Sequence, residues 1–178
     1  IGMTNFPFRD ETQLRDVESL NLLAQARKDG REAWAWNGIR KKGRDNARTP
    51  MQWDASANAG FTAGTPWIDV NPNYRQINVH EAQADPDSIL HFYRRLLALR
   101  QGSDALRSGT FRLLLPEHPQ LLAYERACGE ERIRVCCNFS GAPAVLPSEI
   151  QGDCLLCDGV ENGRMEPYGL FCVQLLHH

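Results

Sequence analysis

Apolar residues in the first part of the chain recur at helical spacing. Between residues 12 and 29 they fall three or four positions apart and form one stripe, which predicts an amphipathic helix. Thr12 is the expected N-cap of this helix, and Gly30 stands where a left-handed C-terminal cap is expected. The pattern then predicts a shorter helix over residues 31–40.

The clearest helical pattern covers residues 86–101. Asp85 can cap this helix, Pro86 suits its first turn, and Gly102 ends it. Residues 43–75 separate it from the earlier helices and are rich in Gly, Pro, Asn, Asp and Thr, without a sustained period. Because loops of this length are uncommon in compact proteins and are usually functional, we expect a site in this segment.

After about residue 102 the pattern changes to short apolar runs between turn residues. Pro, Gly and Asn-Gly signals separate these runs, as they do in antiparallel sheets. The pattern therefore predicts an antiparallel sandwich or a curled sheet. The expected strands are 110–115, 120–126, 131–139, 153–157 and 170–176.

The composition is that of an ordinary globular protein. The chain has 178 residues, with 20 Lys and Arg against 22 Asp and Glu, a formal net charge of −2, and 42% hydrophobic residues. These values exclude a disordered tail, a collagen-like fibre and binding to polyanions through bulk charge. No apolar run is long enough to span a bilayer, so we expect no membrane partner. Because the first residue is Ile1, a missing signal peptide gives no information on compartment.

The cysteines lie in the last third of the chain, and we expect them to be reduced and buried, as small apolar residues are. Cys154 and Cys157 have the CxxC spacing, but on a regular strand residues three apart point to opposite faces. The chain has no second CxxC pair, and none of its five histidines stands at ligand spacing. We therefore expect no metal site, and histidines that are exposed or partly packed.

The densest basic run is Arg40-Lys41-Lys42, followed by Arg44 and Arg48. A surface that binds nucleic acid needs more cations, with aromatic side chains spaced along one face, so we favour a solvated face or local ion pairs. The chain carries no P-loop, GxGxxG or GxSxG motif, and we expect no cofactor. No spacing isolates two carboxylates in an apolar setting, so no catalytic pair is predicted.

One block stands out, the run from Arg44 to Trp53 with the sequence RDNARTPMQW. Two arginines four apart around Asp-Asn, followed by Thr-Pro, suit a rigid loop. In such a loop an arginine fork can pair with a carboxylate or donate to vicinal hydroxyl groups of a sugar. A structural arginine network explains the same block equally well.

At this block the sequence resembles the α-glucosidase branch of the α-amylase superfamily, glycoside hydrolase family 13. The resemblance extends in order over nearly the whole chain. Within the family, the sequence is most similar to oligo-1,6-glucosidases and trehalose-6-phosphate hydrolases. The matching segments are Ile1–Asn5, Arg15–Asn21, Arg44–Trp53, Ala59–Trp67, Val70–Tyr74, Ile77–Val79 and the run ending at Arg100.

This resemblance implies an α+β fragment of two parts. Residues 1–104 are expected to be the helical and loop end of an (α/β)8 barrel after its eighth strand. Residues 105–178 are expected to form an antiparallel β-sandwich C-terminal domain. Family members are retaining enzymes with an aspartate nucleophile and a glutamate acid. The family's catalytic acids would all precede Ile1, so we expect no catalytic residue in this chain.

Two substrate-binding roles carry over from the resemblance. Arg44 matches the arginine that clamps the terminal glucose at subsite −1, and Arg48 matches the arginine that lines the cleft nearer subsite +1. The resemblance implies a cytoplasmic α-glucosidase acting on short α-glucosides, with the remainder of the parent enzyme as partner. Trehalose-6-phosphate hydrolase is the alternative within the class, ahead of a sucrose isomerase or transferase. A non-catalytic carbohydrate-binding or structural module is the alternative from another class.

Overall fold

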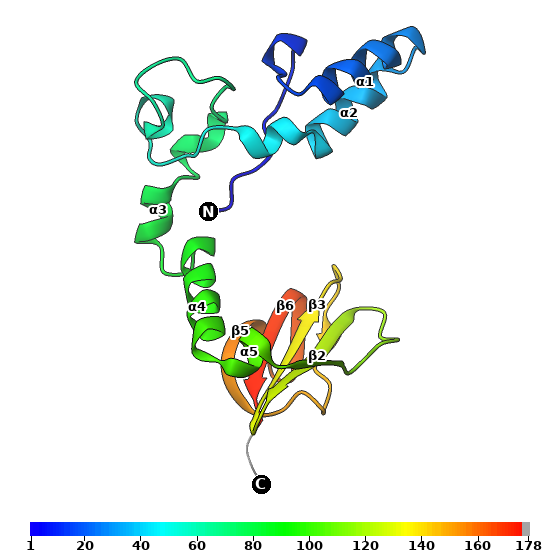
Figure 1. Cartoon of the computed structure of the whole chain (residues 1–178), viewed down its shortest axis with the longest axis vertical. Helices are drawn as coiled ribbons and strands as arrows, with labels where there is room; N and C mark the ends of the chain where they lie inside the picture. The colour runs from blue at the N-terminus through cyan, green and yellow to red at the C-terminus, as the bar shows by residue number, and fades with distance from the viewer. Residues whose placement is uncertain (176–178) are drawn as a thin grey trace. The chain divides into compact units, whose positions relative to one another are not determined.

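The computed structural model describes residues 1–175. Its contacts divide the chain into two compact units, Ile1–Phe92 and Tyr93–His178, which are described separately below. The first unit is helical with long turns, and the second consists of two helical segments and a sheet (Figure 1). Helices end at Ser108 and strands begin at Thr110, so the change from helical to strand structure lies a few residues after residue 102, and the units divide earlier, within the helix Ile89–Gly102.

A helical hairpin forms the first part of the first unit. Helix α1 (Val17–Lys28) and helix α2 (Glu32–Lys42) run side by side, joined by a turn in which Gly30 has a φ of +66° (Figure 1). Gly30 was expected in this conformation. The expected N-cap Thr12 is wrong: Asp16 caps α1 by accepting from the backbone N–H of Ser19.

The residues before α1 form a separate short element, which explains the error. The Asp10 side chain accepts from the backbone N–H of Thr12, and the Gln13 side chain accepts from the backbone N–H of Asp10. Together these bonds form a capping box on the 3-10 turn η1 (Glu11–Gln13). The apolar stripe thus extends over two separate elements, η1 capped by Asp10 and α1 capped by Asp16. Leu14 and Leu23 enter the same buried cluster as Phe8 on either side of the break.

The rest of the first unit is mostly loop, organised by short turns and helices. Their bounds are η2 (Arg44–Arg48), η3 (Ala57–Gly60), η4 (Pro72–Arg75), α3 (Val79–Ala84) and the start of α4 (Ile89–Gly102). The sequence predicted α4 but not α3. Asn78 begins α3 by accepting from the N–H of Glu81.

The second unit carries a six-stranded antiparallel sheet after the short helix α5 (Asp104–Ser108). Its strand order is β1-β2-β3-β6-β4, and β5 pairs with β6. The strands are β1 (Thr110–Leu113), β2 (Leu121–Cys128), β3 (Glu131–Asn138), β4 (Ala144–Val145), β5 (Asp153–Glu161) and β6 (Arg164–Gln174). All strands within residues 1–175 belong to this one curled sheet, so the expected sandwich is not confirmed.

One face of the sheet covers a small apolar core. Ala123, Cys136 and Val173 lie on adjacent strands and are buried together with Ile150 and Met165. The last expected strand, 170–176, is the second half of the longer β6; residues 176–178 lie outside the described part. The hairpin between β5 and β6 turns at Asn162 and Gly163, both with positive φ, as the sequence Asn-Gly predicts.

The two CxxC thiols do not diverge as a regular strand would require. The pairing of β5 with β6 shifts register between Cys154 and Leu156, which marks a β-bulge. The bulge breaks the simple alternation of side chains. Cys154 and Cys157 are therefore neighbours, and burial together with the Cys157 thiol raises the pKa of Cys154. Both are free thiols and exposed, as is Cys128, so the expectation that the cysteines are buried is wrong for these three and confirmed for Cys136 and Cys172.

Gly109 allows α5 to lie close to the sheet. A Cβ there would lie 2.5 Å from the carbonyl oxygen of Ala105 and 2.6 Å from that of Ala127. Both atoms are backbone and cannot rotate away. We expect Gly109→Ala to lower the free energy of unfolding of the second unit by about 1–3 kcal/mol. Gly102→Ala is the matched control, because a Cβ there meets no described atom within 4 Å. Equal denaturation midpoints for the two variants would contradict the packing argument.

Candidate functional site

The arginine-rich block folds around a buried carboxylate, Asp45. It lies on η2 with 1% of its surface exposed. Its Oδ2 accepts from the backbone N–H groups of Arg15 at 2.7 Å and Asp16 at 2.9 Å, and its Oδ1 accepts from Arg48 Nη1 at 3.1 Å. Asp45 thereby joins the segment before α1 to the loop after α2.

Asp16 is the second buried acid of the site. Besides capping α1, its Oδ1 contacts Arg44 Nη2 at 2.8 Å and Arg48 Nη1 at 3.6 Å. Burial by itself would raise the pKa of this carboxyl. Hydrogen bonds from Ser19 and Arg44 outweigh that effect and hold the pKa of Asp16 below its ordinary value. The carboxylate is therefore ionised at neutral pH.

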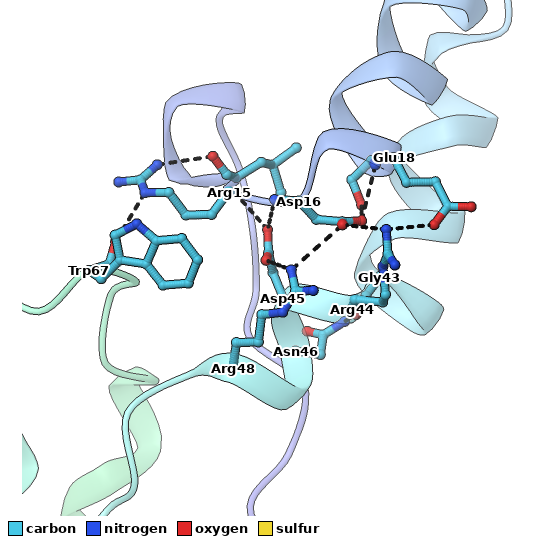
Figure 2. Close-up of polar contacts among 11 residues, drawn as sticks. Arg15, Asp16, Glu18, Gly43, Arg44, Asp45, Asn46, Arg48 and Trp67 are labelled. Atoms are coloured by element: carbon cyan, nitrogen blue, oxygen red, sulfur yellow. Dashed lines mark hydrogen bonds and ion pairs between the residues drawn. The ribbon is translucent and has the colours of Figure 1, made fainter.

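Arg44 and Arg48 flank these two acids, as Figure 2 shows. Nη2 of Arg44 also contacts Glu18 Oε2 at 2.8 Å, so it is shared between two carboxylates of the α1 terminus. The side chains of Arg44 and Arg48 are 58% and 39% exposed. Among the contacts within residues 1–175, Arg44 uses only Nη2 and Arg48 only Nη1. Each guanidinium therefore retains several N–H donors for another group.

The structure brings together both arginines that the sequence singled out. Asp16 and Asp45 were not predicted as their partners, nor was Glu18 as the third acid. Asp45 stands inside the motif itself, but its burial is decided by the N–H groups of residues 15 and 16, far away in the sequence. The arginine network and the sugar-binding interpretation are therefore compatible, because the acids orient arginines that remain half exposed.

The loop after the block is anchored by Gln52, which is fully buried. Its Nε2 donates to Asn73 Oδ1 at 3.1 Å and to the carbonyl oxygen of Ile77 at 2.5 Å. Its Oε1 has no hydrogen-bond partner within the described residues. Asn71 ties the same loop to the N-terminal segment by donating to the carbonyl oxygen of Thr4 at 3.0 Å. These bonds make the long loop an ordered support for the arginines.

Two further properties concern the whole described part of the chain. In residues 1–175 every helix is too short or too polar to cross a lipid bilayer. Over the same residues, His, Cys, Asp and Glu side chains nowhere gather in threes with the spacing that a metal ion needs.

Comparison with known proteins assigns the fold around these arginines. Residues 1–109 match the alpha-amylase catalytic domain. The chain belongs to the alpha-amylase family. An oligo-1,6-glucosidase of Parageobacillus thermoglucosidasius is 47% identical over 154 residues, which cover 84% of this chain and 27% of that protein. A glucan 1,6-alpha-glucosidase of Streptococcus dysgalactiae subsp. equisimilis is 41% identical over 183 residues, which cover 98% of this chain and 34% of that protein.

Solved structures of related enzymes have the same fold as this chain over nearly its whole length. The trehalose-6-phosphate hydrolase of Bacillus licheniformis superposes with a TM-score of 0.87 at 38% identity, over 99% of this chain and 34% of that one. The trehalulose synthase of Pseudomonas mesoacidophila MX-45 superposes with a TM-score of 0.87 at 33% identity, over 97% of this chain and 34% of that one. The chain thus spans about a third of the length of the relatives it matches.

Proposed function

We propose that this chain is the C-terminal part of a retaining α-glucosidase that hydrolyses terminal α-glucosidic bonds of short oligosaccharides, as an oligo-1,6-glucosidase does. In this proposal residues 1–104 end the (α/β)8 barrel, and residues 105–178 form its antiparallel β C-terminal domain. The catalytic carboxylates belong to the remainder of the enzyme. Arg44 and Arg48 bind the substrate, Arg44 at the terminal glucose and Arg48 nearer the leaving group.

The single observation that carries the proposal is the pair of half-exposed arginines held by buried acids. A guanidinium that is fixed on one side and free on the other can donate to two adjacent sugar hydroxyls without losing side-chain freedom on binding. Asp16 and Asp45 provide that fixation for Arg44 and Arg48. The relatives support the substrate class, since their names place them among glucosidases.

The surface of α4 supports the assignment to a larger enzyme. Ile89, Tyr93 and Leu97 follow one another at intervals of four and are each at least half exposed. No residue of this helix is buried within the described part of the chain. An apolar stripe of this kind is typical of an interface with further protein. We assign it to the contact with the absent part of the barrel.

A chimeric enzyme tests the proposal. Residues 1–178 would replace the corresponding third of the Parageobacillus thermoglucosidasius oligo-1,6-glucosidase, and hydrolysis of isomaltose would be followed. We expect the chimera to be active and the 178-residue chain alone to be inactive. In the chimera, Arg44→Ala and Arg48→Ala each remove the charge-assisted hydrogen bonds that the arginine would donate to two sugar hydroxyls. Each substitution should therefore lower kcat/KM by about 10- to 100-fold. Lys41→Ala, on the same basic run, is the control and should have wild-type activity.

The outcomes separate this function from its rivals. A folded, inactive chimera would overturn the proposal and favour a non-catalytic carbohydrate-binding or structural module. Full activity of both arginine variants would remove the substrate-binding role and leave only the structural network. Trehalose-6-phosphate hydrolase is the alternative, because that enzyme of Escherichia coli is 48% identical over 141 residues. Residues 27–31 carry three basic side chains, as a site for a sugar phosphate would need, but Arg27 among them is already paired with Glu11 at 2.5 Å and Glu32 at 3.0 Å, which gives this alternative little support.

A further inference from the structure

Two exposed thiols lie together on β5, at an edge of the sheet. Among the described strands, β5 pairs with β6 alone, so one side of its backbone has no neighbouring strand (Figure 1). Cys154 and Cys157 are both exposed and both free. Cys128, at the end of β2, is the third exposed thiol, whereas Cys136 and Cys172 are buried. An oxidant dissolved in water therefore reaches Cys154 and Cys157 from solvent.

The β-bulge in β5 turns the Cys154 side chain toward Cys157. Cys154 Sγ accepts a hydrogen bond from the backbone N–H of Leu156, so its side chain leans along the strand in the direction of Cys157. Its own S–H donates to the Cys157 sulfur. On a regular strand, residues three apart point to opposite faces and their thiols do not meet. The shift of register between Cys154 and Leu156 brings the two sulfur atoms together.

The two sulfur atoms are suited to different steps of an oxidation. Burial and the neighbouring Cys157 thiol raise the pKa of Cys154, so Cys154 is held as a thiol at neutral pH. Because the thiolate is the nucleophile toward an oxidant, Cys157 is the sulfur that reacts first. Cys172 also lies near Cys154, but burial raises its pKa to about 12, which keeps it protonated and unreactive.

We propose that Cys154 and Cys157 are a redox-active dithiol, which hydrogen peroxide oxidises reversibly to a disulfide across the β5 bulge. The Cys157 thiolate attacks one oxygen of the peroxide, the O–O bond breaks, and the hydroxide that leaves takes up the Cys157 proton. The Cys154 sulfur then attacks the sulfur of the Cys157 sulfenic acid. The S–S bond forms, the S–O bond breaks, and the hydroxyl group leaves as water with the Cys154 proton. The two thiols lose two electrons, and the peroxide becomes two molecules of water.

The spacing of the two cysteines makes this disulfide easy to reduce. Three residues of regular strand span about 10 Å, whereas the Cα atoms of a disulfide lie about 4.4–6.8 Å apart. The bulge and the unpaired side of β5 take up part of this difference, and the rest remains as strain. Strained, exposed disulfides are the labile ones, so thiols in solution return this bridge to the dithiol. The inference is independent of the proposed function, because Arg44 and Arg48 belong to the first unit.

Mild peroxide treatment of the full 178-residue chain, followed by cleavage before each aspartate, tests the dithiol. The resulting peptide 153–157 contains Cys154 and Cys157 and no other cysteine. We expect this peptide to become about 2 Da lighter and to regain its mass with dithiothreitol. In a Cys128→Ser chain, which avoids cross-links through the third exposed thiol, the thiols that react rapidly with Ellman's reagent should fall from two to none.

Phenylarsine oxide measures the proximity of the two thiols without oxidation. It forms two As–S bonds with neighbouring thiols and releases water. We expect it to bind the Cys128→Ser chain at least about 100-fold more tightly than chains that also carry Cys154→Ser or Cys157→Ser, because the second bond is intramolecular. Melting temperatures of the three chains should agree, since serine and cysteine have nearly the same shape.

Three results would each overturn the inference. The first is equal affinity of the arsenical for all three chains. The second is addition of oxygen to peptide 153–157 without loss of hydrogen, which would show that Cys157 is oxidised and Cys154 does not follow. The third is a bridge from Cys154 to Cys172, which would appear as a link between peptide 153–157 and the peptide that begins at Asp158.

Discussion

Replacing Glu125 with alanine is expected to lower the free energy of unfolding of the second unit by about 3–5 kcal/mol. Glu125 is 4% exposed and lies in a row across three strands, between Arg112 on β1 and Arg134 on β3. Its Oε1 accepts from Arg112 Nη2 at 3.1 Å, and its Oε2 accepts from Arg134 Nε at 2.9 Å. Arg132 approaches Oε1 at 3.6 Å. Without the carboxylate, three guanidinium groups face one another without a counter-charge.

The same carboxylate makes the second unit sensitive to acid. Burial by itself raises the pKa of Glu125, but the hydrogen bonds from Arg134 and Arg112 outweigh it and lower the pKa below 4.5. Because the folded-state pKa is the lower one, the stabilisation is complete above the unfolded-state value of about 4.5. We expect it to be lost as pH falls from about 5 through the folded-state pKa.

Amide hydrogen exchange of β2 and β3 is the suitable measurement, because all four tryptophans precede residue 68 and fluorescence does not report on the sheet. Glu125→Gln keeps the shape of the side chain and removes its charge. The β2 and β3 amides of this variant should therefore be less protected than those of the wild type at pH 7, and their protection should be nearly constant between pH 5 and 3. Glu117→Ala, in an exposed turn, is the control. Equal protection in Glu125→Ala and Glu117→Ala would show that the arginines do not depend on this acid.

Local signals in the sequence predicted the turns and most elements correctly. Gly30 and the pair Asn162-Gly163 adopt the positive φ values for which glycine and asparagine are suited, and these conformations depend only on neighbouring residues. Most of the longer helices and strands followed from periodicity, although β6 begins six residues before the expected strand, and α3, α5 and β4 were not predicted. Thr12 failed as an N-cap because Asp10 and Asp16 offered two better acceptors within one continuous stripe.

The errors concern features that long-range contacts decide. A bulge near Leu156 cannot be recognised in a run of alternating or apolar residues, since the pairing with β6 creates it. For the same reason the sequence located Arg44 and Arg48 but not their support. The partners of Asp45 are backbone N–H groups about thirty positions away, and no side-chain pattern marks a backbone donor. Motif spacing thus identified two arginines that lie together in the structure, but not the groups that hold them.

This dependence on Asp45 leads to the second large expected effect, a loss of about 3–5 kcal/mol in the first unit for Asp45→Ala. The substitution leaves the N–H groups of Arg15 and Asp16 without their acceptor inside a buried region, and each such group costs about 1–3 kcal/mol. It also removes one of the two acids that hold Arg48. Because the Asp16 backbone precedes α1, the start of the helical hairpin should loosen with the loop.

Urea unfolding followed by tryptophan fluorescence measures this loss, since Trp34, Trp36, Trp53 and Trp67 all belong to the first unit. Asp45→Asn retains one oxygen for the N–H groups but offers Arg48 no charge, so its midpoint should lie between those of the wild type and Asp45→Ala. Asp87→Ala, at an exposed position of the same unit, should have the wild-type midpoint. If Asp45→Ala unfolds at the midpoint of Asp87→Ala, the arginines are held by Asp16 and Glu18 alone. In that case Asp45→Ala should leave the activity of the chimera unchanged, whereas loss of the support predicted here should reduce it together with stability.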